Sequence, residues 1–334
     1  MSEFRQNSVT KEWVIIAPER AKRPDQWKHE RPARDPLPPY RDGCPFCPGH
    51  EEMTPPATYS LQTDDAWSLR VVPNKFAALA PTRTPTRHAE GPFLQADGFG
   101  IAEVVIESPR HDESLSTLPV ETIEQVLRAF KLRHVAMAAD PRISLVTIFR
   151  NHGPLAGTSL EHPHSQIIAT PIVPPHVRDP WREAQEHYDT FGTCAYCELL
   201  RAEIKQEARV IGETDHFVAF CPWSSKTPFE VRVFPRRHHA SYTWSHDSEL
   251  YDLAYLLKDA LERLRVGLGN PDYNLLIRSA ASGDEDARHL HWYLVIVPKL
   301  STTAGFEMGT GIYINPTAPE VAAEFLRKVN LSEA

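Results

Sequence analysis

The sequence has no hydrophobic run that approaches the roughly 20 apolar residues needed to span a bilayer, so we expect no membrane-spanning helix. Its N-terminal stretch, MSEFRQNSVTKEW, also lacks the apolar core of a secretory signal, and we expect a cytoplasmic protein. Basic residues are outnumbered: 36 Lys and Arg against 44 Asp and Glu give a net charge of −8. This balance argues against a general nucleic-acid-binding protein, whereas a nucleotide pocket needs only a few local arginines.

Cysteine is scarce, with five residues in a chain of 334, yet four of the five form two CxxC pairs. The pairs are Cys44 with Cys47 and Cys194 with Cys197. In a reducing compartment this spacing indicates metal binding more than disulfide formation. The fifth cysteine, Cys221, is expected to be a small buried hydrophobic residue.

The chain consists of two similar halves, for which we predict domains at residues 1–178 and 179–334. Each half holds a CxxC pair, strands rich in Val, Ile and Phe, one helix with an apolar stripe, and an HxH triplet. We predict the helices at 119–138 and 248–268, and strands at 100–108, 144–149, 228–234 and 273–278. Residues 175–193 are expected to link the halves, and the proline-rich residues 18–60 to form an extended arm. The predicted fold class is α+β, with a helix packed over an antiparallel sheet in each half.

Two histidines in each half have a matched spacing, because 51 residues separate His111 from His162 and also His238 from His289. Together with the cysteines they form two Cys₂His₂ sets, which suit tetrahedral Zn²⁺. In the second set His239 or His291 is an alternative ligand, and that site could hold zinc, iron or no metal. The alternative for both sets is reduced, buried thiols. The predicted metal ligands are Cys44, Cys47, His111, His162, Cys194, Cys197, His238 and His289.

The first HxH triplet offers a histidine beyond the one that a metal needs. Side chains two apart on a strand face the same way, so His162 can serve the metal while His164 stays free beside it. A neutral imidazole is a competent nucleophile toward phosphorus. Gln166 follows on the same face and can stabilise a phosphoryl group, and the loop 151–159 can offer backbone N–H groups. A histidine that merely packs or hydrogen-bonds is the alternative, which the combination with Gln166 disfavours.

The run Asn151-x-Gly153, Gly157-x-Ser159-x-x-His162-Pro163-His164-x-Gln166 resembles the active-site motif of galactose-1-phosphate uridylyltransferases, a branch of the histidine-triad superfamily. The similarity extends to residues 20–24, the CPFC pair, and residues 74–79 and 107–111. It implies a duplicated histidine-triad-like fold, usually dimeric, and ping-pong transfer of a nucleoside monophosphate through His164. The resemblance also implies phosphate contacts from Gln166 and Ser159, and a nucleotide site lined by Arg20, Arg23, Asn74, Asn151 and Gly157.

The chain departs from the family pattern near its C-terminus. Gly305-Phe306-Glu307-Met308 has Phe where the bacterial uridylyltransferases carry Tyr, and Lys75 stands where the family has Asp. The tail GFEMGTGIYINP resembles relatives that act as adenylyl-transferring phosphorylases. From the active-site motif we favour a UDP-glucose:hexose-1-phosphate uridylyltransferase of galactose metabolism. The tail supports the alternative, an adenylyltransferase that acts on ADP-glucose or adenylyl sulfate. A non-enzymatic zinc module is the third possibility.

The second half is predicted to keep its metal and lose the chemistry. By its HxH triplet, His291 takes the place of His164, and Tyr293 takes the place of Gln166. The loop before it, residues 278–288, is acidic and contains one glycine.

Overall fold

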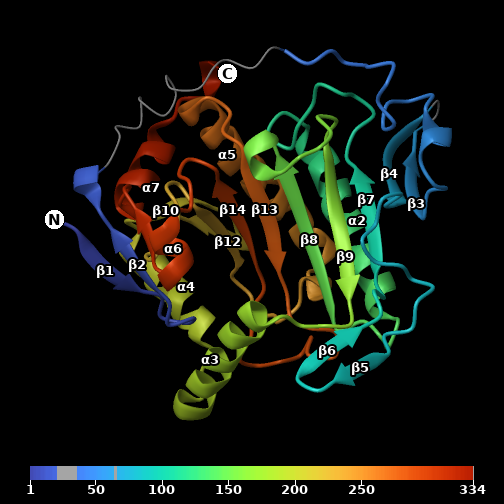
Figure 1. The fold of residues 1–334 in the computed structure, drawn as a ribbon. Helices are drawn as coiled ribbons and strands as arrows, with labels where there is room; N and C mark the ends of the chain where they lie inside the picture. Colours follow the sequence, from blue (N-terminus) through green and yellow to red (C-terminus); the bar gives the residue numbers. More distant parts are fainter. Residues whose placement is uncertain (21–35, 64–65, 334) are drawn as a thin grey trace.

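The computed structural model describes residues 1–20, 36–63 and 66–333, and within them the dominant feature is a ten-stranded sheet (Figure 1). Its order is β10-β11-β12-β14-β13-β8-β9-β7-β4-β3, and every neighbouring pair is antiparallel. The first half supplies β3 (Tyr59–Gln62), β4 (Trp67–Pro73), β7 (Ile101–Ile106), β8 (Leu145–His152) and β9 (His164–Thr170). The second half supplies β10 (Val210–Glu213), β11 (Phe217–Phe220), β12 (Val231–Pro235), β13 (Tyr273–Arg278) and β14 (Tyr293–Pro298).

The two halves have the same topology. Read outward from the centre, the first half runs β8-β9-β7-β4-β3 and the second β13-β14-β12-β11-β10. Each half carries one long helix at the same point of the chain: α2 (Val120–Ala138) before β8, and α5 (Asp247–Leu268) before β13. The predicted α+β class with a repeated unit is therefore confirmed. The halves meet where β8 pairs with β13, and the predicted boundary after residue 178 falls within α3 (Pro175–Phe191).

The main core lies between the sheet and the helices α2 and α5. The apolar stripe predicted for α5 is buried there, with Leu250, Leu253, Leu257, Leu261 and Leu264 each at most 2% exposed. Alternate strand residues, such as Ile167 and Ala169 of β9, belong to the same core. Because neighbours on a strand point to opposite faces, the residues between them face away from the helices. This second face carries the candidate site, and we call it the open face.

The CxxC segments pack against the open face, one in each half. Cys44, Phe46 and Cys47 form a small core with Val104 and Ile106 of β7. In the second half Cys194, Ala195 and Tyr196 pack with residues of β11 and β12. The second CxxC pair leads into a helix, α4 (Ala195–Gln206), that the sequence analysis did not predict. Of the predicted arm, residues 36–50 contain no helix or strand, and residues 21–35 lie outside the described parts.

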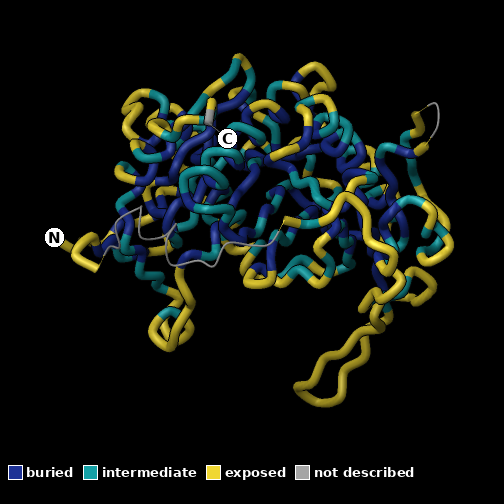
Figure 2. Tube along the Cα trace, turned by 90° about the horizontal axis from the view of Figure 1, so that it is seen from above, coloured by how far each residue is buried: buried dark blue, intermediate teal, exposed yellow. Residues whose placement is uncertain are grey.

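Shorter elements surround this frame. A three-stranded sheet combines β1 (Glu3–Gln6) and β2 (Trp13–Ile16) with β15 (Tyr313–Asn315) from the C-terminal segment. The hairpin of β5 (Arg87–Glu90) and β6 (Phe93–Ala96) projects from the body, and all its strand residues are exposed (Figure 2). The remaining helices are α6 (Gly305–Thr310) and α7 (Pro319–Lys328). Across the described residues, none of the helices combines the length and the apolar character that a membrane crossing requires.

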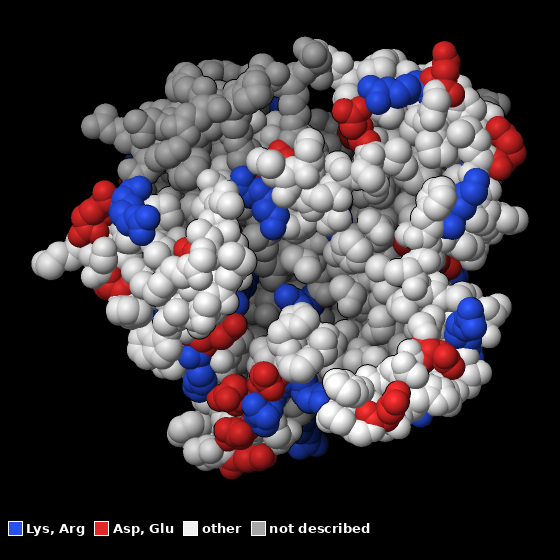
Figure 3. Space-filling model, viewed as in Figure 1, with Lys and Arg blue, Asp and Glu red and all other residues white. Residues whose placement is uncertain are grey.

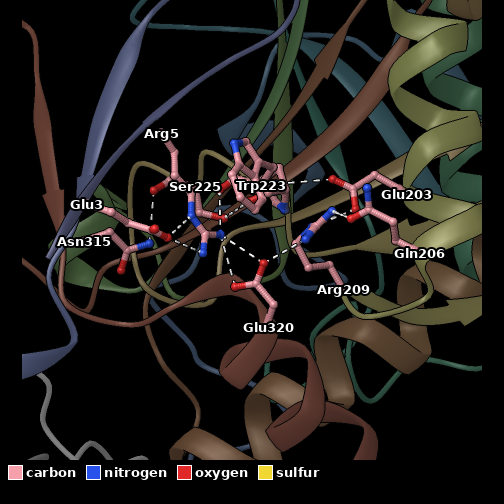
Figure 4. A network of polar contacts seen from close by, with 10 residues as sticks. Glu3, Arg5, Glu203, Gln206, Arg209, Trp223, Ser225, Asn315 and Glu320 are labelled. Atoms are coloured by element: carbon pink, nitrogen blue, oxygen red, sulfur yellow. Dashed lines mark hydrogen bonds and ion pairs between the residues drawn. The ribbon is translucent and has the colours of Figure 1, made fainter. Parts of the chain in front are cut away.

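A buried polar network ties the two ends of the chain together (Figure 4). Arg5 on β1 donates to both carboxylate oxygens of Glu320 on α7, at 3.0 and 3.1 Å. Arg209 donates to the same carboxylate at 2.7 Å and to Glu203 of α4 at 2.8 Å. The Arg5 guanidinium also lies 3.8 Å from the centre of the Trp223 ring. The N-terminal strand is thereby fixed to the second half, near the C-terminal helix.

Candidate active site and metal centres

The first metal group consists of the four predicted residues. Cys44, Cys47, His111 and His162 are all buried, and one ligand atom from each lies within 4.8 Å of the others. His162 Nδ1 is 3.6 Å from the Cys44 sulfur and 3.3 Å from His111 Nδ1. Its other ring nitrogen, Nε2, donates to the Ser108 carbonyl at 2.8 Å, which fixes Nδ1 as the atom that faces the group.

The protonation states of this group fit a cation. Burial lowers the pKa of His162 to about 4 and also lowers the pKa of His111, so both rings are neutral at pH 7. Burial raises the pKa of the Cys44 thiol, because a lone thiolate is poorly solvated there. A divalent metal relieves that penalty by taking the thiolates together with neutral imidazoles. The donor set and its burial therefore suit a tetrahedral metal centre.

The second metal group corrects one predicted ligand. It consists of Cys194, Cys197, His238 and His291, again with ligand atoms within 4.8 Å of one another. The Cys197 sulfur is 3.2 Å from His238 Nδ1 and 3.3 Å from His291 Nδ1. His289, which we predicted from the spacing, is not a member; only its backbone carbonyl contacts the group, through the Cys194 thiol at 3.5 Å.

The strand positions explain this correction. His162 stands two residues before β9, which begins at His164, and His291 stands two residues before β14, which begins at Tyr293. Like His162, His291 donates through Nε2 to a backbone carbonyl, that of Pro235, at 3.0 Å. The equal spacing of 51 residues was therefore misleading, because the loop of the second half is longer. It also follows that Tyr293, and not His291, takes the place of His164.

The candidate nucleophile, His164, is held in one tautomer. It begins β9, is 8% exposed, and its Nδ1 lies 2.8 Å from the His162 carbonyl oxygen. A carbonyl only accepts, so Nδ1 carries the proton and Nε2 keeps its lone pair. Burial lowers the pKa of His164, which keeps the ring neutral at pH 7. Phe46, which lies within the CxxC segment, has its ring 5.5 Å from the His164 ring and 5.9 Å from the His162 ring, so this segment packs against both histidines.

Behind β9 lies a buried ion pair that the sequence analysis missed. Arg150 of β8 pairs with Glu107, and their side chains are 3% and 0% exposed. Ser165 donates to the same carboxylate at 2.5 Å, and Arg150 reaches the His164 carbonyl oxygen at 3.5 Å. The pair thus contacts the backbone carbonyl of the nucleophile and the side chain of the residue that follows it. The sequence offered two indications of this pair. Arg150 directly follows the apolar run Ser144–Phe149, and Glu107 begins the family-like run 107–111.

Gln166 and Asn151 face the same side as His164. In the β8–β9 pairing Phe149 lies opposite Gln166, so the antiparallel register places Asn151 opposite His164. Gln166 is half-buried, and within the described residues its side-chain amide makes no hydrogen bond. An amide with free donors two residues from a nucleophile is suited to bind phosphoryl oxygens.

The loop between β8 and β9 is anchored by the second half. Gly153 and Gly157 have φ of 83° and 89°, a region that favours glycine, and they flank the 3-10 turn Pro154–Ala156. Asn274 of β13 donates to Asn151 Oδ1 at 2.8 Å and to the Ala156 carbonyl at 2.9 Å. Asp272 accepts the Leu155 N–H at 2.6 Å. Ser159, in the same loop, is exposed. Asn274 had no sequence indication, because only the pairing of β13 with β8 brings it here.

The other predicted substrate residues lie elsewhere. Asn74 follows β4, and its N–H bonds to Ala102, which pairs with Ile168 farther along β9. Arg20 lies near the C-terminal segment. The pKa of Glu307 in that segment is lowered mainly by hydrogen bonds from backbone N–H groups, and the charge of Arg20 lowers it further. Arg23 lies outside the described residues. One chain therefore brings together His164, Gln166, Asn151 and the glycine loop, but not Arg20.

The chain resembles proteins of known family over nearly its whole length. A family model described as the N-terminal domain of galactose-1-phosphate uridyl transferase matches residues 1–174, and one of a domain of unknown function matches residues 116–330. The chain is 36% identical to the ADP-glucose phosphorylase of Arabidopsis thaliana, over 99% of this chain and 93% of that protein. It is 30% identical to the galactose-1-phosphate uridylyltransferase of Thermotoga maritima, over 99% of both.

Solved structures show the same likeness. The crystal structure of the Arabidopsis thaliana ADP-glucose phosphorylase with bound ADP-glucose matches with a TM-score of 0.83 at 34% identity, covering 99% of each chain. A uridylyltransferase structure matches with a TM-score of 0.75 at 28% identity, covering 98% of this chain and 97% of that one.

Proposed function

This chain belongs to the galactose-1-phosphate uridylyltransferase family and is a nucleotidyltransferase, and on that premise we propose that it transfers a nucleoside monophosphate from a nucleotide sugar through Nε2 of His164. The observation that carries the proposal is the hydrogen bond from His164 Nδ1 to the His162 carbonyl, which leaves Nε2 unprotonated. The neutral ring is the form that attacks phosphorus.

The reaction has two balanced steps. In the first, the Nε2 lone pair forms a bond to the α-phosphorus of the donor, and the bond to the bridging oxygen breaks, releasing a sugar 1-phosphate. In the second, a phosphate oxygen of the acceptor attacks the same phosphorus, and the bond to His164 breaks. In this proposal the Gln166 amide and the N–H groups of the glycine loop bind the phosphoryl oxygens as charge develops on them.

Two nucleotide sugars are candidates for the donor. The active-site motif favours UDP-glucose as donor with a hexose 1-phosphate as acceptor, and this pair is one candidate. The higher identity and TM-score for the ADP-glucose phosphorylase, together with Phe306 in the GFEM run, support ADP-glucose with inorganic phosphate as acceptor. We therefore place adenylyl transfer first and uridylyl transfer second.

The proposal includes Zn²⁺ in both metal groups. Zinc would cross-link each CxxC segment to the strand ends and keep its four ligands deprotonated, and it would take no part in proton transfer. In the first group it would fix His162, whose carbonyl orients His164. The metal is thus assigned a positioning effect on the nucleophile.

The proposal also includes a homodimer. If Arg20 binds substrate, as the family resemblance implies, the arginine must come from a second copy, because in one chain it lies near Glu307 and not near His164. Mixing Arg20→Ala protein with His164→Gly protein tests this point. Activity that returns on mixing two inactive variants supports a shared site, and continued inactivity of a mixed dimer contradicts it.

The central experiment is a reaction quenched with alkaline denaturant, in which a phosphorus–imidazole bond survives, with donors labelled on the α-phosphate. Wild-type protein should retain label from ADP-glucose, less from UDP-glucose, and lose it when phosphate or a hexose 1-phosphate is added. His164→Gly protein should fold, bind metal and retain no label. Label on the His164→Gly protein, or normal turnover by it, would show that the covalent route through this residue is wrong.

A further inference from the structure

The second half contains a cavity of about 340 Å³ that the proposed reaction does not use. Its floor is the open face of β12, β14 and β13, represented by Arg232, Val295 and Arg278. Its walls come from α3, from the turn between β1 and β2, and from the segment that leads into β15. Figure 3 shows a hollow on this face of the molecule, with Lys and Arg atoms at its rim and in its depth.

The cavity occupies the place in the second half that the candidate active site occupies in the first. Tyr293 begins β14 as His164 begins β9, two residues after the metal-group histidine in each case. Val295 stands in β14 where Gln166 stands in β9. A phenol and an isopropyl group replace the nucleophile and the amide. The position can therefore bind a ligand but cannot form a nucleotidyl-histidine.

The charge of the lining is positive, although the whole chain has a net charge of −8. The basic side chains are Lys226, Arg232, Arg278 and Lys299, and the acidic ones are Glu12 and Glu230. Lys226 pairs with Glu12 at 2.8 Å, and Arg232 pairs with Glu230 at 2.9 Å. Arg278 has no carboxylate partner among the described residues. A half-buried guanidinium without a counter-ion, next to other cations, favours an anionic ligand.

Aromatic rings form much of the remaining wall. Trp181, Tyr196, Tyr293 and Tyr313 line the cavity. Tyr293 is held in place by stacking on Phe234, with ring centres 4.6 Å apart and planes 4° from parallel. Lys226 Nζ lies 5.3 Å from the centre of the Tyr313 ring, so a cation and an aromatic face adjoin at the rim. Cations beside aromatic faces suit a ligand with phosphates and a planar base.

From these contacts we propose that the second half binds a nucleoside diphosphate non-covalently in this cavity, which we call the second-half pocket. The phosphates lie against Arg278, and the base lies among the tyrosines. The assignment does not depend on the chemistry at His164, so each can fail without the other.

Equilibrium dialysis of the metal-loaded, full-length protein tests the assignment, with α,β-methylene-ADP and α,β-methylene-UDP as probes that cannot transfer a nucleotidyl group. We expect about two nucleotides per chain in the wild type. Arg278→Gln removes the unpaired charge, and Val295→Phe fills the pocket without changing its charge. Each should weaken the second binding event by about tenfold or more while labelling of His164 proceeds at the wild-type rate.

Arg236→Gln is the matched control, because Arg236 directly follows β12 but pairs with Glu213 outside the pocket. This variant should keep both nucleotides. One nucleotide per chain in the wild type, or two in both pocket variants, would overturn the assignment. Equal binding of inorganic pyrophosphate and of the nucleotide probes would also overturn it, because the pocket would then bind anions without a base. Thermal melting curves of both pocket variants, compared with that of the wild type, identify a variant that is misfolded.

Discussion

The chemistry at the candidate site depends on the state of single side chains. His164 is buried, neutral and held through Nδ1, and those three properties together leave a lone pair on Nε2. The ion pair of Arg150 and Glu107 lies beneath the same backbone and contacts the carbonyl of His164 and the hydroxyl of Ser165. A nucleophile fixed on both sides loses little entropy on approach to phosphorus.

Gln166 is the residue whose loss should separate chemistry from binding. Gln166→Ala removes donors that bind phosphoryl oxygens most strongly when negative charge develops, so the rate of His164 labelling should fall by roughly 10²–10³. Donor affinity should change little. Single-turnover quench measurements and equilibrium binding check both parts. If affinity collapsed and the labelling rate at saturation stayed normal, Gln166 would have to be assigned to ground-state binding.

At the scale of the elements, the strands decide which residues meet and the helices decide how stable the arrangement is. The register of β8 and β9 sets Asn151 opposite His164, and the pairing of β13 with β8 brings Asn274 to the glycine loop. On the other face, α2 buries His134, which is 3% exposed and whose Nδ1 has no hydrogen-bond partner in the described structure.

Asn274 should act as a positioning residue for the loop 153–157. Asn274→Ala leaves Asn151 Oδ1 and the Ala156 carbonyl without their donor. The loss should destabilise the loop conformation seen here by about 1–3 kcal/mol. We expect kcat/KM of the first step to fall by roughly tenfold. Asn274→Asp, which keeps the shape but not the amide donor, should behave in the same way, and wild-type kinetics in both variants would rule the contact out.

His134 should make the stability of the protein depend on pH. Burial lowers its pKa in the folded state to about 4, below the unfolded value of 6.5, with Glu285 acting in the opposite direction. Below pH 6.5 the unfolded state therefore takes up a proton that the folded state takes up only near pH 4, and the free energy of unfolding falls across that window. The full difference corresponds to about 3 kcal/mol.

His134→Leu removes this proton uptake and keeps a side chain that suits a helix. Compared with the wild type, the variant should lose about 3 kcal/mol less stability between pH 7 and pH 4. Urea denaturation at a series of pH values measures the difference. Parallel pH profiles for the two proteins would mean that His134 is not buried in its neutral form.

The whole molecule is one sheet built from two copies of a unit, each with a metal group on the open face. The copies have diverged where it matters for chemistry: one has a histidine at the start of its last strand and the other a tyrosine. The network of Arg5, Arg209 and Glu320 closes the second half by fixing the N-terminal strand to it.

Metal content tests the duplication at this scale. The purified protein should carry about two zinc ions per chain, one for each Cys₂His₂ group. His291→Ala should lose one of them and spare much of the activity, because the second half lacks the nucleophile. His289→Ala is the matched control and should keep both. Elemental analysis decides between them, and loss of metal from His289→Ala alone would restore the ligand that the spacing first suggested.

The sequence by itself determined the features that are local or periodic. The apolar stripe of α5 predicted a helix, the alternation in β9 put His164 and Gln166 on one face, and the CxxC pairs predicted metal groups. The motif from Asn151 to Gln166 indicated the chemistry for the same reason, since it lies in two adjacent strands and their loop.

Only the tertiary structure decided what depends on pairing between distant segments. It replaced His289 with His291, because loop length does not reveal where a strand begins. It brought Asn274 to the glycine loop and closed the second-half pocket with segments from both ends of the chain, contacts that no local pattern encodes. It also placed Arg20 beside the C-terminal segment, because the strand before it, β2, pairs with β15 and not with the ten-stranded sheet that carries His164.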